Sequence, residues 1–77
     1  MENLANKIEA LLFLKGEPIS HGALMRFFKA DAVAVNTALS ELEEKLSGHS
    51  LTLLHKEGEV ALGTRPEFGP MFEAIRK

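Results

Sequence analysis

Three histidines are the only imidazoles in this 77-residue chain, and they are the first candidates for catalysis or metal binding. A helical zinc site needs two such ligands at i and i+4, so that both imidazoles lie on one face. His21, His49 and His55 do not have that spacing, and no carboxylate partner suggests a zinc site. The absence of cysteine excludes a thiolate zinc site, a cysteine nucleophile and a disulfide framework. We therefore expect solvated histidines in turns and in a strand, and no bound metal.

Other groups that could do chemistry also have simpler roles. Ser20 lacks the Gly-x-Ser-x-Gly surroundings of an activated serine and is better placed to cap a helix. Glu41, Glu43 and Glu44 form an acidic cluster, but nothing in the sequence indicates a cleft that would shift their pKa values for acid/base work, so we expect a solvated helix face. The six glycines are scattered and form no phosphate-binding loop. The sequence thus predicts neither an enzyme nor a cofactor.

Composition indicates one small domain. Hydrophobic residues make up 45% of the chain and charged residues 26%, with a net charge of −2. A chain of this length holds a single core, which here has to be stable without a disulfide. The longest uncharged apolar run, Ala10 to Leu14, is far shorter than the roughly 20 residues of a membrane span, and the N-terminus is not basic like a signal peptide. We expect a cytoplasmic protein that does not enter a membrane.

Three segments have the apolar spacing of amphipathic helices. The first covers about residues 2–15 and ends at Gly16; the second covers about 20–29, with Ser20 as its cap; the third begins at the cap Asp31 and ends at Gly48. The expected core-facing residues are Leu4, Ile8, Leu11 and Leu12, then Ala23, Leu24, Phe27 and Phe28, and finally Val35, Leu39, Leu42 and Leu46.

The pattern then changes to a period of two, which indicates strands. Residues 51–56 and 60–63 flank Glu57 and Gly58 and predict a β-hairpin. A last helix restarts at Pro70 and keeps its apolar spacing to Ile75. The order of three helices, a hairpin and a C-terminal helix predicts a mainly α, α+β fold, the winged helix-turn-helix. No stop signal precedes Lys77, so we expect residues 1–77 to be one winged-helix domain from the N-terminal half of a longer protein.

A winged helix suggests DNA binding, but the charges argue against it. From Asp31 to Gly48, the recognition-helix position carries a net charge of −3, and its first turns offer only Asn36 for base readout. In the hairpin, Lys56 and Arg65 are cancelled by two glutamates. The one local basic excess is Arg26 and Lys29, enough only for weak nonspecific contacts with phosphates. A DNA-binding transcriptional regulator therefore stays the alternative hypothesis.

Two separated motifs carry a family resemblance. The run ALLFLKGEP at residues 10–18, followed by Ile19 and Ser20, and the run LGTRP at 62–66, followed by Glu67 and Phe68, resemble the N-terminal domain of the segregation and condensation protein B family. The resemblance spans essentially the whole chain in element order. It implies a non-enzymatic subunit with two tandem winged helices.

Such a subunit forms a homodimer and binds a kleisin, which links it to the SMC ATPase of bacterial condensin. The family's N-terminal winged helix is associated mainly with dimerisation, and its second winged helix contributes strongly to kleisin binding. The resemblance therefore implies functions in chromosome partition, chromosome condensation and cell division, in the cytoplasm and at the nucleoid through the complex.

The residues expected to meet a partner are apolar and lie near the ends of the domain. At about 100° per residue, Leu14 shares a broad face with the core residues of the first helix, while Phe13 lies nearly opposite them. Phe13 is therefore either buried under the hairpin or the last helix, or part of a dimer surface. The same alternatives, core or contact, apply to Met71, Phe72 and Ile75.

Overall fold

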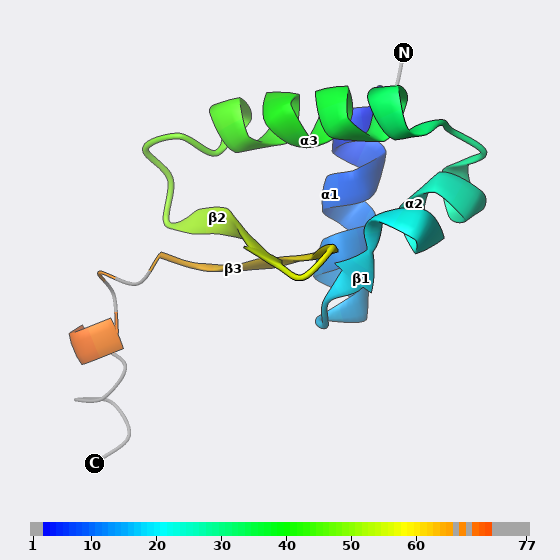
Figure 1. Cartoon of the computed structure of the whole chain (residues 1–77). Coiled ribbons are helices and arrows are strands. Elements are labelled where there is room, and N and C mark those ends of the chain that lie inside the picture. Colours follow the sequence, from blue (N-terminus) through cyan, green and yellow to red (C-terminus); the bar gives the residue numbers. More distant parts are fainter. Residues whose placement is uncertain (1–2, 66, 68, 72–77) are drawn as a thin grey trace.

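The computed structural model describes residues 3–65, 67 and 69–71, and Figure 1 shows the arrangement of their helices and strands. The elements in chain order are α1 (Leu4–Lys15), β1 (Ile19–Ser20), α2 (His21–Phe28), α3 (Ala32–Lys45), β2 (Leu51–Lys56) and β3 (Glu59–Thr64). The predicted mainly helical winged-helix fold is confirmed for this part of the chain. No helix in it is both long and apolar enough to cross a membrane.

Polar side chains define where the helices begin. Ser20 Oγ accepts a hydrogen bond from the backbone N–H of Ala23 at 3.0 Å, and Asp31 Oδ1 accepts one from Ala34 at 2.8 Å. Both caps were predicted, because such side chains satisfy N–H groups that a helix leaves free. Asn3 caps α1 in the same way, so this helix begins later than predicted.

The hairpin turns at Glu57 and Gly58, both with positive φ, as the two-residue turn of a twisted hairpin requires. The prediction of two strands was incomplete, however. Residues 19 and 20 form β1, which pairs antiparallel with β3, so the sheet has three strands in the order β1-β3-β2. A two-residue strand has no detectable period, which is why the sequence indicated only a helix cap there.

The core lies between α1, α3 and the inner face of the hairpin. Ile8 and Leu12 of α1 are almost completely buried, and they share one cluster with Leu42 of α3 and Val60 of β3. In Figure 1 the helix α3 lies across one end of α1, with the hairpin on the other side of the core. All four predicted core residues of α3 are buried, namely Val35, Leu39, Leu42 and Leu46.

Helix α2 contributes less to the core than its pattern predicted. Leu24 is fully buried and Phe28 packs partly against the core, but Phe27 is 67% exposed. The prediction of a buried Phe27 was wrong, because α2 has only eight residues and packs its buried side against few neighbours.

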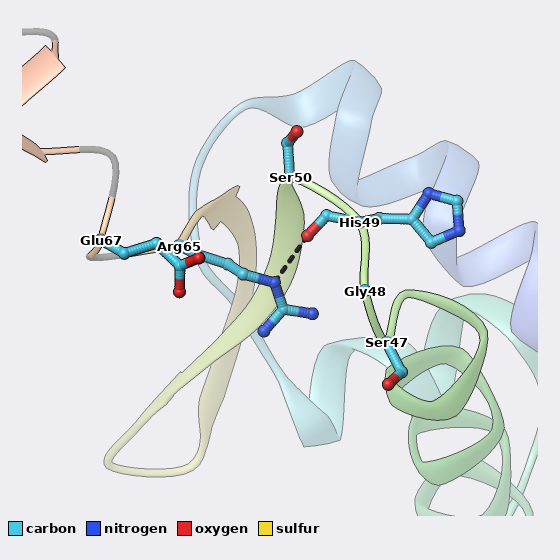
Figure 2. Close-up of a pocket in the computed structure, with 6 residues that line it drawn as sticks. All are labelled: Ser47, Gly48, His49, Ser50, Arg65 and Glu67. Atoms are coloured by element: carbon cyan, nitrogen blue, oxygen red, sulfur yellow. Dashed lines mark hydrogen bonds between the residues drawn. The ribbon is translucent and has the colours of Figure 1, made fainter.

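Arg65 ties the end of β3 to the end of α3. Its Nε donates to the carbonyl oxygen of His49 at 2.6 Å, drawn in Figure 2, and its Nη2 donates to that of Leu46 at 2.8 Å. The backbone N–H of Arg65 also donates to the carbonyl oxygen of Ser50. Since carbonyls at a helix C-terminus lack partners within the helix and carry partial negative charge, a guanidinium suits this position. Arg65 is therefore a structural residue of the fold, and not the free hairpin charge that the sequence suggested.

Replacing Arg65 should destabilise the domain. Arg65→Ala leaves two carbonyl oxygens without their charged donor, so the free energy of unfolding should fall by about 1–3 kcal/mol. Urea denaturation followed by circular dichroism measures this. Arg26→Ala is the control, because Arg26 is exposed and its removal should change stability by less than about 0.5 kcal/mol. Equal stability of the two variants would contradict the structural role of Arg65.

Candidate interaction surface

The last turn of α1 presents two large apolar side chains to solvent. Phe13 is 77% exposed and Leu14 is 81% exposed, and we call this pair the α1 surface. Of the two alternatives for Phe13, burial under the hairpin is therefore wrong. The placement of Leu14 on the core-facing side was also wrong, because it lies about 60° around the helix from Leu11, at the margin of the buried stripe.

An apolar hollow of about 280 Å³ lies beside the α1 surface, with Phe13 in its wall. Ala10 of α1, Leu51 of β2 and Leu62 of β3 supply the other apolar lining. Asn6 and Glu9 are the two polar residues of the lining. The sequence gave no signal for this hollow, because its walls come from a helix and two distant strands.

Lys45 of α3 holds those two polar residues. Its Nζ donates to Asn6 Oδ1 at 2.7 Å and to Glu9 Oε1 at 2.9 Å. The bonds link α3 to α1 at the rim of the hollow, so polar groups there already have a partner within the domain. An apolar side chain entering the hollow would therefore meet a prearranged site with few polar groups to desolvate.

A second hollow, of about 340 Å³, lies at the loop after α3 and is polar. Figure 2 shows its lining residues, Ser47, Gly48, His49, Ser50, Arg65 and Glu67. The guanidinium of Arg65 is aimed at the loop carbonyl of His49, while the imidazole of His49 points away from it (Figure 2). The negative end of α3 and the carboxylate of Glu67 both disfavour an anion here. The arrangement supports loop structure and offers no nucleophile with a base beside it.

The histidines are less uniform than predicted. His49 is exposed, as expected. His55 Nε2, in contrast, lies 3.4 Å from Glu43 Oε1, so a carboxylate does neighbour one imidazole, across the α3 and β2 elements. His21 is partly buried, and its Nε2 is buried without a hydrogen-bond partner, which corrects the expectation of a solvated side chain. Among the residues that the structure describes, no three His, Asp or Glu side chains form a metal-binding group.

The end of α2 and the start of α3 form a third surface, with both basic and apolar residues exposed. We call it the α2 corner and define it by Arg26, Phe27, Lys29 and Val33. Val33, in the first turn of α3, is 73% exposed. Sequence reasoning found the two cations but missed the apolar pair: Phe27 was expected in the core, and Val33 was not singled out.

Lys29 ends α2 in the left-handed conformation, at φ 54° and ψ 47°. Glycine is the usual residue in this position, because a side chain there costs roughly 1 kcal/mol. A positive charge near a helix C-terminus offsets part of that cost. The chain thus keeps a side chain where the backbone favours none.

The remaining predicted contact residues lie at the C-terminal end. Glu67 and residues 69–71 have helical conformation, in agreement with a helix restarting near Pro70, and Met71 is 51% exposed. Phe72 and Ile75 lie outside the described residues.

Comparison with known proteins places this fold. The model of the family "segregation and condensation complex subunit ScpB" matches residues 6–77. No curated protein matches the chain.

Two solved structures have the same fold. One is the crystal structure of a dimer of the ScpB N-terminal domain complexed with a ScpA peptide, with a TM-score of 0.81 at 20% identity; the match covers 92% of this chain and 91% of that one. The other is ScpB from Mycobacterium tuberculosis, with a TM-score of 0.81 at 25% identity, and here the match covers 95% of this chain but 47% of that one. Since the family model extends over nearly the whole chain, and the fold agrees with it, the chain belongs to the family of the segregation and condensation complex subunit ScpB.

Proposed function

We propose that this domain is a non-enzymatic part of a bacterial chromosome segregation and condensation complex, and that it self-associates and supports binding of the kleisin ScpA. The observation that carries self-association is the α1 surface, where Phe13 is 77% exposed beside an apolar hollow. Family membership supplies the biological context.

Self-association follows from the physical chemistry of the α1 surface. An exposed aromatic side chain is a common anchor of protein interfaces, and a neighbouring hollow gives it a place to bury. In a two-fold dimer the same surface is used by both copies, so every favourable contact occurs twice. We propose that Phe13 and Leu14 form the centre of this interface, with Met71, Phe72 and Ile75 contributing from the C-terminal end. The ScpB N-terminal domain of the same fold is itself a dimer, which supports the proposal.

Kleisin binding is the second part of the proposed function. A protein with this fold binds a ScpA peptide, and ScpA in turn connects such subunits to the SMC ATPase. The chain aligns with most of an isolated ScpB N-terminal domain and with about half of ScpB from M. tuberculosis. We propose that it is the N-terminal winged-helix domain of a tandem pair, which works in the cytoplasm and reaches the nucleoid through the complex.

The alternative, a DNA-binding regulator, draws support only from the fold and from Arg26 and Lys29. The exposed side of α3 carries Glu41, Glu43 and Glu44, which repel phosphates from the helix that should enter the groove. The function we propose therefore assigns the domain a protein partner.

A substitution in the α1 surface should abolish the dimer. Phe13→Glu places a charge where two copies would bury an aromatic ring, so the mass in sedimentation velocity should fall from about twice 8.5 kDa to that of the monomer at micromolar concentration. Phe27→Glu is the matched control, because Phe27 is a comparably exposed aromatic residue on α2 and its variant should stay dimeric. A monomeric unaltered chain would contradict self-association, and a dimeric Phe13→Glu variant would contradict this surface.

DNA binding should be absent even where electrostatics favour it. Titrating the domain into a labelled duplex at low salt should leave the fluorescence anisotropy unchanged at micromolar protein, because α3 carries a net negative charge. Binding that weakens with salt and is lost in the Arg26→Ala/Lys29→Ala variant would support the regulator instead.

A further inference from the structure

Phe27 is exposed yet held in place. The ring of Phe28, which packs against the core, meets the ring of Phe27 edge to face, with centroids 4.9 Å apart and planes at 88°. This contact restrains an aromatic side chain that is 67% exposed. A restrained aromatic group loses little conformational entropy when a partner covers it, which suits an anchor for binding.

Two cations flank this anchor. Arg26 lies in the last turn of α2, and Lys29 follows it in a left-handed conformation that glycine would adopt without strain. Both side chains are exposed, and neither belongs to an ion pair within the part of the chain that the structure describes. The one acid at the corner, Asp31, already uses Oδ1 to cap α3.

The charges of the rest of the domain direct an acidic partner to this place. The exposed glutamates of α3 repel it, Lys45 is paired with Glu9, and Arg65 is bonded to loop carbonyls. Arg26 and Lys29 remain as adjacent free cations beside exposed apolar groups.

We infer that the α2 corner is the docking surface for an acidic segment of the kleisin, in which an apolar side chain packs against Phe27 and Val33 while carboxylates pair with Arg26 and Lys29. This inference rests on the proposed function and adds a second surface, separate from the α1 surface that joins two copies.

The same cations could attract nucleic acid, but the corner fits a protein segment better. A phosphate backbone makes no use of an aliphatic side chain such as Val33, and two cations give only weak, strongly screened binding to DNA. An amphipathic peptide uses the cations and the apolar pair together.

Calorimetric titration of the domain with the purified ScpA of the same organism tests the inference. Arg26→Glu/Lys29→Glu should weaken binding by more than about tenfold, and Phe27→Ala by about tenfold. Affinity for the unaltered domain should fall as salt rises from 50 to 200 mM, flagged here as roughly a Debye-length effect. The matched control is Lys7→Glu/Lys56→Glu, which makes the same change in net charge at two exposed lysines elsewhere and should bind with about the same affinity.

Lys29→Gly separates a binding role from a structural one. Glycine relieves the left-handed backbone, so the variant should unfold at no lower temperature than the unaltered domain, and yet bind ScpA several-fold more weakly. If Lys29 served only the helix end, the affinity would not change.

The outcomes are distinguishable. Unaltered affinity in Arg26→Glu/Lys29→Glu and in Phe27→Ala, with binding by the unaltered chain intact, overturns the inference and leaves the proposed function standing. Failure of the unaltered chain to bind ScpA overturns the kleisin-binding part of the proposed function and the inference with it. Corner-dependent binding of a DNA duplex in place of ScpA assigns the surface to nucleic acid and also overturns the inference. Sedimentation velocity shows whether each corner variant remains a folded dimer.

Discussion

Burial of one stripe of α1 is the constraint on which the rest of the structure depends. Ile8 and Leu12 are covered by α3 on one side and by the hairpin on the other, and no disulfide adds to the stability of this small core. A helix that serves a small core from one stripe leaves its other faces uncovered. The exposure of Phe13 and Leu14 follows from this geometry, since the described domain has too few elements to surround α1.

The polar contacts of the domain serve the same core. Lys45 joins α3 to α1, and Arg65 joins the end of β3 to the loop after α3, so that the two long-range ties lie on either side of the packed interior. Both cations are thereby committed to the fold. The charges left for a partner are those at the end of α2, where Arg26 and Lys29 lie beside Phe27, while the exposed side of α3 is acidic. The winged helix thus keeps its topology but not the electrostatics of a DNA reader.

The helices were predictable because each has a strong local signal. The caps Ser20 and Asp31, the left-handed Gly16 and the apolar spacing of α3 are all interactions within about one turn of the chain. The hairpin was predictable for the same reason. Strand β1 was not, because two residues form a strand only when β3 is already beside them. The C-terminal helix could be followed in the structure only as far as Met71.

The amino-acid sequence by itself determined the fold class, the helix boundaries within a few residues, the acidic character of α3 and the family resemblance that the family model confirms. These depend on residue type and on spacing along the chain. Only the tertiary structure decided which apolar residues stay outside, namely Phe13, Leu14 and Phe27, and that Arg65 belongs to the fold. The physical reason is that periodicity identifies a residue's direction around its own helix, whereas burial depends on whether another element, distant in sequence, lies in that direction.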